Sequence, residues 1–432
     1  HSLPGEGSPR GVRPVTASAL NLLLLLLVAA NAQGQSRDLG NTGEVRPPND
    51  RVHVETQGNV RVTTAVPSRE ETRRLFGFSL YARNIQPVWV QVENLGQEML
   101  WFLPIGVDDA YFTPIETSYR LKNRESQLDW DLNRDYYGKR MILRIEPGGK
   151  RSGYIFTRLD EGTKSFNIDV LGLDEQFRMS FLVPVPGLKL DYYNVDWDSL
   201  YSADEIRDVD IDALIEGLEA LPCCVTDKGG QNNGDPLNLA VIGSREDLFY
   251  AFKRSGWDET ETIYTTSLWK TAMSAMAGSE YRYSPVSALY LYGRPQDVAL
   301  QKSRDSIHQR NHLRLWMTPM RFEGQPVWIG QISRDIGVRF TWKGVTTHKI
   351  DPDVDDAREY LLENLAYAQS LRAYGYVGGV GRAAFDEPSE NLTGDPYYTD
   401  GLRIVLFASS EAVSLDDIKR IYLSRRAIDY IE

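Results

Sequence analysis

Histidine and arginine side chains are concentrated between residues 283 and 355. This stretch holds three of the five histidines, and residues 294–343 carry nine Lys or Arg against four Asp or Glu, although the whole chain has a formal net charge of -12. A local excess of positive charge is typical of a surface or pocket that binds anions. The candidate ligand-binding residues are Arg294, His308, Arg310, Arg314, Trp316, Arg334 and Asp351.

A strand over residues 308–316 would place alternate side chains on one face, because the side-chain period of a strand is two. A planar guanidinium can hold an oxyanion with two parallel hydrogen bonds, and an imidazole adds a further donor. This face is therefore predicted to bind a small anionic ligand, such as one that bears a phosphate. The alternative is that the arginines pair with nearby aspartates in a structural network. The side chains that share the face are His308, Arg310, His312, Arg314 and Trp316.

The same stretch also fits a hydrolase. His312 would act as general base and Asp335 would orient its ring, with Ser287 or Ser333 as nucleophile and His348 as a further candidate catalytic residue. No nucleophile elbow surrounds either serine. Hydrolysis therefore stays the second hypothesis, behind anion binding.

A zinc site is a weaker interpretation of these residues. His308, His312 and His348 with Asp335 or Asp351 would supply enough ligands. On a strand, however, His308 and His312 lie ~13 Å apart, and the neighbouring arginines would repel a cation. We therefore expect no metal and no cofactor.

The first 32 residues read as a signal peptide. Arg10 and Arg13 precede an apolar run over residues 19–28, and Ala30-Asn31-Ala32 has the form of a cleavage site. An uncleaved anchor is the alternative, although the run is shorter than the ~20 residues of a bilayer span. The chain is expected to be exported to the periplasm or secreted after cleavage near Ala32. Residues 33–74 have few apolar side chains and are predicted to be a flexible tether.

Residues 75–190 are predicted to form an all-β domain. Short apolar runs with a period of two are separated by Gly, Pro and Asn, which favours an immunoglobulin-like sandwich. Trp89, Trp101 and Phe102 are its expected core aromatics. The predicted strands cover residues 87–92, 99–103, 141–145, 153–157, 165–170 and 177–183.

Residues 191–220 are predicted to be an acidic linker helix. Asp208, Asp210, Asp212 and Glu219 match the spacing of a calcium loop, but Ala213 stands where the sharp turn of that loop requires Gly. The adjacent residues Cys223 and Cys224 are the only cysteines of the chain. They could form a vicinal disulfide, remain thiols or bridge to another chain.

Residues 221–432 are predicted to form a second domain of mixed α/β (α+β) type. A buried strand over residues 237–244 leads into a helix over 245–255, with Ser244 as N-cap and Asp247 three residues later. Further helices are expected over residues 267–276, 354–374 and 415–428, and a strand over 402–407.

Several segments of this second domain occur in an order that resembles the C-terminal domain of LssY proteins. They are GDPLNLAVIGS, the pair Gly256-Trp257, SPVSALYLYGRPQD, RNHLRLW, PVWIGQISRDIG and THKIDPDVDDAREYL. The resemblance covers about residues 221–407. It implies a place near membrane-lipid or lipid-phosphate chemistry, with membrane lipid-processing proteins as partners, and it implies no defined reaction.

Composition narrows the remaining choices. A sequence pI near 5.1 argues against nucleic-acid binding, because phosphate neutralisation requires a basic contact face. The chain is expected to be a bacterial envelope protein, and three hypotheses remain for its function: an anion-binding accessory module, a hydrolase, or a structural assembly protein.

Overall fold

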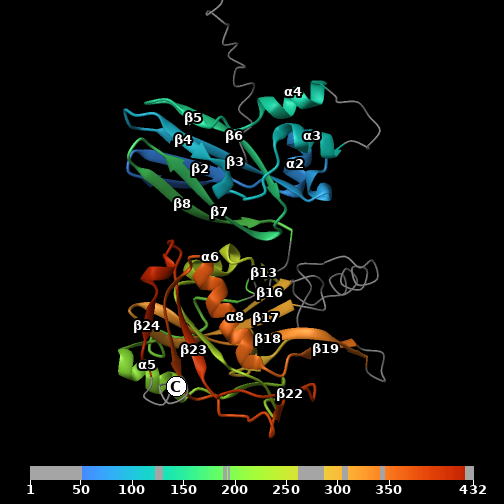
Figure 1. Ribbon diagram of the computed structural model, residues 1–432, viewed down its shortest axis with the longest axis vertical. Helices are drawn as coiled ribbons and strands as arrows, with labels where there is room; N and C mark the ends of the chain where they lie inside the picture. The colour runs from blue at the N-terminus through green and yellow to red at the C-terminus, as the bar shows by residue number, and fades with distance from the viewer. Residues whose placement is uncertain are drawn as a thin grey trace, which may run out of the picture. The chain divides into compact units, whose positions relative to one another are not determined.

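The computed structural model describes residues 51–121, 130–187, 192, 195–260, 287–303, 310–340 and 346–423, and only the backbone of residues 338–340 and 346–348. These residues form several β-sheets with short helices, which agrees with the predicted multidomain α+β class (Figure 1). None of the helices they form is both long enough and apolar enough to cross a membrane.

Residues 51–187, the N-terminal β region, contain two antiparallel four-stranded sheets. Both sheets contribute to one hydrophobic core, with Val62 and Val90 from the first and Phe102, Ile168 and Phe181 from the second. The first sheet has the order β1 (His53–Gln57), β2 (Val60–Ala65), β3 (Ile85–Asn94) and β6 (Lys150–Arg158). The second has the order β5 (Arg144–Ile145), β4 (Leu100–Leu103), β7 (Gly162–Leu171) and β8 (Gln176–Val185).

The prediction of a flexible tether over residues 33–74 is wrong for its described part. Residues 51–74 form β1, β2 and most of α2 (Arg69–Phe76). Val60 and Val62 alternate toward the core along β2, and Ser68 caps α2 in a reciprocal capping box with Glu71. Few apolar residues are enough here, because β1 is largely exposed and β2 turns alternate side chains toward the core. The signal segment and the first part of the tether lie outside the described residues.

Helical segments also occur in the N-terminal β region, where the sequence predicted almost none. They are α2, the 3-10 turns η2 (Leu80–Arg83) and η3 (Pro104–Gly106), α3 (Pro114–Leu121) and α4 (Trp130–Gly138). A second apolar cluster beside them includes Phe76, Trp89 and Tyr136. The prediction of Trp101 as a core residue is wrong. Its side chain is 47% exposed, because the two-residue period of β4 turns it away from its buried neighbours.

A large mixed sheet dominates residues 195–423, the C-terminal α/β region. Most neighbouring strands are antiparallel, but β12 with β23, β20 with β24, and β9 with β17 are parallel. The sheet runs through β13 (Asp258–Glu259), β16 (Val298–Ser303), β17 (Arg310–Phe322), β18 (Gln325–Phe340), β12 (Leu239–Ile242), β23 (Arg403–Ala408), β20 (Leu371–Val377) and β24 (Lys419–Ile421). Two further strands, β9 (Arg207–Val209) and β19 (Thr346–Ile350), pair with β17 and β18.

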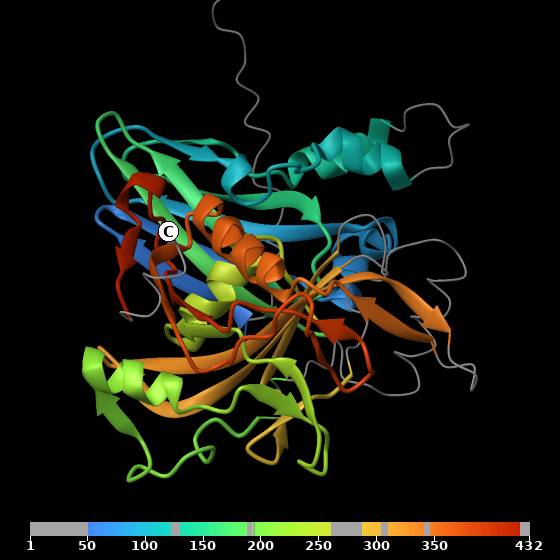
Figure 2. The same ribbon diagram turned by 60° about the horizontal axis from the view of Figure 1, so that its bottom comes forward.

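Both faces of the large sheet are covered. Helices α6 (Arg245–Arg254) and α8 (Val354–Tyr367) pack on one face, where their leucines meet Leu313 and Leu315. Helix α5 (Ile211–Glu219) packs on the other face through Leu214 and Leu218. Figure 2 shows long strands of the sheet between α8 and α5.

A small four-stranded sheet also packs on the α5 face, where Val225 contacts the cluster of Trp316 and Ile329. Its order is β11 (Asn233–Pro236), β10 (Cys224–Thr226), β14 (Tyr290–Leu291) and β15 (Arg294–Pro295), and β21 (Ser389–Glu390) forms a separate hairpin with β22 (Pro396–Tyr397).

Several predicted elements of this region are present with altered bounds. The Ser244 cap of α6 is a complete capping box with Asp247, as predicted. The predicted linker helix is reduced to α5, which Asp210 caps by accepting from the amide of Ala213. The helix predicted over 354–374 ends at Tyr367, after which the chain turns into β20.

The helix predicted over 415–428 is wrong for residues 415–423. They form a 3-10 turn, η5 (Leu415–Asp417), and then β24, which pairs with β20 at the sheet edge. Pairing with that edge satisfies backbone groups that a helix would have satisfied internally. The helix predicted over 267–276 and residues 424–432 lie outside the described residues.

Candidate functional site

Seven buried polar residues form a row on the α5 face of the large sheet. The row continues the alternation that places Trp316 and Ile329 on that face. Each of the seven is at most 7% exposed. We call this set the polar row: Gln301 on β16; Arg310, His312 and Arg314 on β17; and Gln331, Ser333 and Asp335 on β18.

His312 and Asp335 form a buried hydrogen-bonded pair, with 2.5 Å between Nε2 and Oδ2. When the carboxylate accepts, Nε2 of the neutral ring carries the hydrogen and Nδ1 becomes the basic nitrogen. Burial lowers the pKa of His312 to about 4, an effect that Asp335 opposes and that the charges of Arg310 and Arg314 increase. The imidazole is therefore neutral at physiological pH.

Arg310 lies two residues before His312 on the same face. Its Nη1 donates to Gln301 Oε1 at 2.5 Å, and its Nε lies 3.7 Å from Asp335 Oδ2. Burial lowers the pKa of Arg310, Asp335 opposes that shift, and the charge of Arg314 adds to it. Since an arginine stays protonated, a guanidinium charge is held inside the region.

Arg314 lies two residues after His312. Its Nη1 donates to Gln331 Oε1 at 2.9 Å, while its Nε and Nη2 donate to the backbone oxygen of Ser287 at 3.2 and 3.1 Å. Gln331 Nε2 in turn donates to Ser333 Oγ at 2.8 Å. Three side chains on two strands are thereby linked.

Asp235 on β11 belongs to the same electrostatic cluster. It is 9% exposed, and Asn391 Nδ2 donates to its Oδ1 at 2.9 Å. Burial raises the pKa of Asp235, the charge of Arg314 opposes that shift, and the charge of Asp335 adds to it. Two guanidinium groups and two carboxyl groups therefore lie within electrostatic reach of one another.

Two arginines of the predicted site lie elsewhere. Arg294 pairs with Asp297 through Nε at 3.0 Å and donates through Nη2 to the Met317 backbone oxygen at 2.8 Å. Arg334 pairs with Asp356 on the α8 face, because its position on β18 alternates with those of the polar row. For these two arginines, the structural-network interpretation describes the contacts that the structure contains.

The other candidate site residues do not belong to the polar row. Trp316 is fully buried on the same face as the polar row, within the apolar cluster. Asp351 accepts from the amide of Asp353 at 3.1 Å in the turn before α8. The backbone of His348 lies in β19 opposite Val338, while its side chain and the whole of His308 are outside the described residues.

Sequence reasoning missed Gln301, Gln331 and Asp235. Gln331, Ser333 and Asp335 alternate in the sequence QISRD, so their shared face could have been found from the period of two. Gln301 and Asp235 carry no such signal. Gln301 joins the cluster through the pairing of β16 with β17, the next strand in the chain, and Asp235 joins it because β11 contacts β18, which is distant in sequence.

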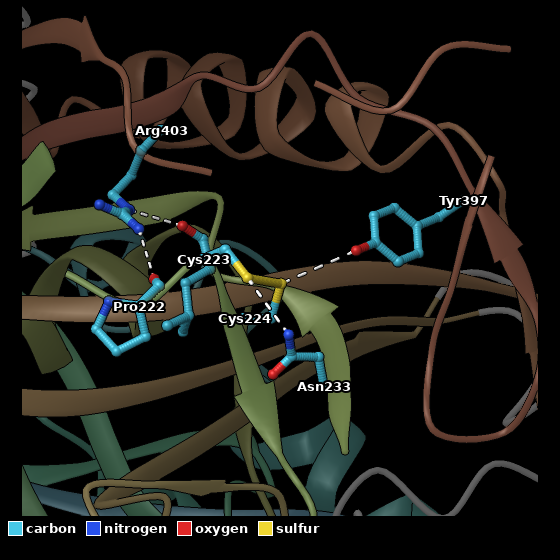
Figure 3. The surroundings of a disulfide bond; sticks show 7 residues. Pro222, Cys223, Cys224, Asn233, Tyr397 and Arg403 are labelled. Atoms are coloured by element: carbon cyan, nitrogen blue, oxygen red, sulfur yellow. Dashed lines mark hydrogen bonds between the residues drawn. A yellow bond between two sulfur atoms is a disulfide. The ribbon is translucent and has the colours of Figure 1, made fainter. Parts of the chain in front are cut away.

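Cys223 and Cys224 are joined in a vicinal disulfide, which is one of the predicted alternatives (Figure 3). Cys224 is buried, its Sγ lies 4.0 Å from Tyr397 Oη, and its register partner in β11 is Pro236. Asn233 Nδ2 lies 3.9 Å from Cys223 Sγ. The disulfide therefore lies beside the strand that carries Asp235.

Arg403 is a fully buried arginine beside the disulfide (Figure 3). Its guanidinium donates to the backbone oxygens of Leu237 at 2.7 Å and Pro222 at 3.0 Å, and also to that of Leu218. Burial lowers the pKa of Arg403 to about 10. These bonds tie α5, the cysteine segment and β23 together.

Among the described residues, no three His, Cys, Asp or Glu side chains are grouped so that they could hold a metal ion. The polar row instead combines arginines, amides and a histidine–carboxylate pair. Such a set can bind an oxyanion or move a proton at His312.

Comparison with known proteins gives a family match within the C-terminal α/β region. No curated protein sequence matches the chain. A family model described as LssY C-terminus matches residues 218–402, a segment that begins within α5 and includes the whole polar row. Residues 218–402 of this chain are therefore similar to the LssY C-terminal family.

Proposed function

We propose that the C-terminal α/β region binds a small ligand with a phosphate or similar oxyanion, and that Arg310 and Arg314 contact it directly. The observation that carries this proposal is that both guanidinium groups are buried on one face of β17, on either side of a neutral His312. The anion-binding class predicted from the sequence remains the first hypothesis.

Burial of like charges supports this assignment. Arg310 and Arg314 act on each other electrostatically, so that each opposes the charge of the other. A buried cation is stable only when it is paired and hydrogen-bonded. Asp335 balances part of this charge, and a bound oxyanion would balance more while using the planar donors of both arginines.

The experiment is ligand-induced stabilisation of the full chain by inorganic phosphate and glycerol phosphate, with glycerol as the neutral comparison. Arg314→Ala should weaken binding about ten- to hundredfold, the effect of losing one charged hydrogen bond of ~1.5–3 kcal/mol. Arg334→Ala is the matched control, since Arg334 lies on the opposite face of the same sheet. Equal loss in both variants, or no stabilisation by either phosphate, would contradict the proposal.

A hydrolase is the second candidate, and the His312–Asp335 hydrogen bond favours it. Asp335 would orient the ring and His312 would act as general base, with Ser333 directly opposite His312 on β18 as the nearest candidate nucleophile. Turnover of nitrophenyl phosphate or nitrophenyl acetate that is lost in both His312→Gln and Ser333→Ala would establish hydrolysis. A purely structural envelope protein would bind neither phosphate probe and turn over neither ester.

The proposal also covers the location of the protein and the role of its N-terminal β region. The chain acts in the bacterial envelope after cleavage near Ala32, next to membrane lipid-processing proteins. Its two N-terminal sheets form an immunoglobulin-like sandwich that serves in docking. Support comes from the charged and apolar pattern of residues 10–32 and from the single core that both sheets share. N-terminal sequencing of exported protein tests the location, and retention of residues 19–28 would contradict it.

A further inference from the structure

A cavity of about 380 Å³ lies at the opposite end of β17 from the polar row. Its floor is the Met317–Met320 part of β17, and one wall comes from Trp197 and Tyr201 in the segment that precedes β9. Arg245 and Arg321 also line it. The volume is within the ~300–1,000 Å³ of sites that hold small organic ligands.

The cavity lies at an irregular part of β17. The register between β17 and β18 shifts between Met317 and Arg321. Pro319 and Pro326 line the cavity and have no amide hydrogen to donate to a strand ladder. The hydroxyl of Thr318 replaces part of the ladder by donating to Val327 O at 2.7 Å and accepting from Met320 N at 3.2 Å. The regular pairing of β17 and β18 is therefore interrupted here, as at a β-bulge.

The wall is held in place by contacts with the sheet. Tyr201 Oη donates to the Met317 backbone oxygen at 2.8 Å and accepts from Arg294 Nη2 at 3.3 Å. The ring of Trp197 lies edge-on to that of Trp328, with 5.7 Å between centroids. The cavity is therefore preformed, so a ligand would not have to order this wall.

The lining combines apolar side chains with a positive rim. Trp197 and Met317 offer an aromatic ring and an adaptable thioether. The Arg245 guanidinium lies 5.1 Å from the Trp197 ring centre. Among the described residues, no carboxylate oxygen lies within 4.0 Å of the guanidinium of Arg245 or Arg321.

Acidic groups near the rim offset only part of its charge. Among the described residues that line the cavity, Asp198 is the one acidic residue. Asp208 is the strand neighbour of Arg321 in β9, beyond ion-pair distance. Two cations therefore face one lining carboxylate, and the rim keeps a positive excess.

We propose that this cavity binds a small organic anion with an aromatic body, in addition to the oxyanion proposed for the polar row. The body would pack on Trp197 and Met317, and the acid group would lie between Arg245 and Arg321. No residue of the polar row takes part.

The test uses two fluorescent probes on the full chain: anilinonaphthalene sulfonate, an aromatic anion, and phenylnaphthylamine, which has the same ring system without the acid group. The sulfonate should bind at one saturable site about tenfold more tightly than the neutral probe. Arg245→Ala should remove most of that preference. Arg382→Ala is the control, because Arg382 is an exposed arginine outside the cavity lining.

Further variants distinguish binding in this cavity from binding elsewhere on the chain. Arg321→Ala repeats the test at a second exposed position, so a failure of one variant to fold does not end the experiment. Trp197→Phe should weaken the binding of both probes to the same extent, and Arg314→Ala should leave the affinity for both probes unchanged. Equal affinity for the two probes would overturn the anion assignment. Sulfonate binding that survives both the Arg245→Ala and the Arg321→Ala change would overturn the location.

Discussion

His312 and Asp335 meet diagonally across two antiparallel strands. The residue directly opposite His312 on β18 is Ser333, and Asp335, two positions further on, still places Oδ2 2.5 Å from the ring Nε2. A shift of one residue in the pairing of β17 and β18 would turn one partner to the opposite face of the sheet. The register of this hairpin therefore decides whether the polar row exists.

Acid should destabilise the protein through His312. The pKa of its ring is about 4 in the fold and about 6.5 when exposed. Between these values the unfolded chain binds more protons at this residue than the folded chain does. The free energy of unfolding therefore falls as the pH drops from about 6.5 to about 4, and above about 6.5 the neutral ring causes no such loss. At about 1.4 kcal/mol per pKa unit, the loss is at most a few kcal/mol.

Urea denaturation of the wild type and of His312→Gln at about pH 5 and about pH 7 measures this contribution. The variant should lose less stability between the two pH values than the wild type loses. Identical losses would show that other groups cause the acid sensitivity.

Asp335→Asn should cost far more stability than Asp356→Asn. Asp335 is 2% exposed and balances both Arg310 and the His312 ring, so its loss should lower the free energy of unfolding by about 3–5 kcal/mol. Asp356 has a side chain that is 53% exposed and pairs with Arg334, where the loss should stay below about 1 kcal/mol. Thermal unfolding of the two variants checks this difference, and equal shifts in Tm would contradict it.

The two-residue side-chain period of a strand is the reason that part of the site could be predicted from the sequence. It placed Arg310, His312 and Arg314 on one face, because spacing of two residues along one strand is a local property. The same rule applied to β18 would have excluded Arg334, whose neighbours Ser333 and Asp335 occupy the polar row.

The pairing of strands could not be predicted. Gln301 joins the site only because β16 pairs with β17, the next strand, and Asp235 joins it because β11 contacts β18, which is distant in sequence. Local periodicity does not determine the order of strands in a sheet. For Arg294, the sequence left ligand binding and pairing with a nearby aspartate open, and the structure contains the ion pair with Asp297, three residues later. The strands β1 and β2 were not predicted, because the polar composition of this segment conceals the alternation of Val60 and Val62.

Arg403→Met should destabilise the fold severely. The change leaves the backbone oxygens of Leu218, Pro222 and Leu237 without this donor, at about 1–3 kcal/mol for each buried acceptor that stays unsatisfied. Arg403→Lys should recover only part of the loss, since an ammonium cannot reproduce the planar set of donors. Soluble yield and Tm are the measurements, with exposed Arg382→Ala as the control. A stable Arg403→Met variant would show that the three carbonyls find other donors.

Loss of the vicinal disulfide should have a small effect on stability. A cross-link between adjacent residues closes the shortest possible loop, so the chain-entropy relation gives only about 1 kcal/mol. The double variant Cys223→Ser/Cys224→Ser should therefore stay folded and retain phosphate binding. Denaturation of the oxidised protein, the reduced protein and the double variant measures the effect. A loss several times larger in the reduced protein alone would point to repulsion between the packed thiols and their neighbours.

Replacing Arg314 with lysine should separate its charge from its geometry. Arg314 reaches Gln331 and the backbone oxygen of Ser287 at once, through three nitrogens of one planar group. Lysine keeps the positive charge but concentrates its donors on one atom, so it cannot span both acceptors. Arg314→Lys should therefore lose stability much as Arg314→Ala does, by roughly 1–3 kcal/mol. If an oxyanion binds at this position, phosphate affinity should fall less in Arg314→Lys than in Arg314→Ala, because the retained charge still attracts the anion. Equal stability of the wild type and Arg314→Lys would mean that the hydrogen bonds to Gln331 and Ser287 contribute little, and that the charge alone accounts for the arginine in the polar row.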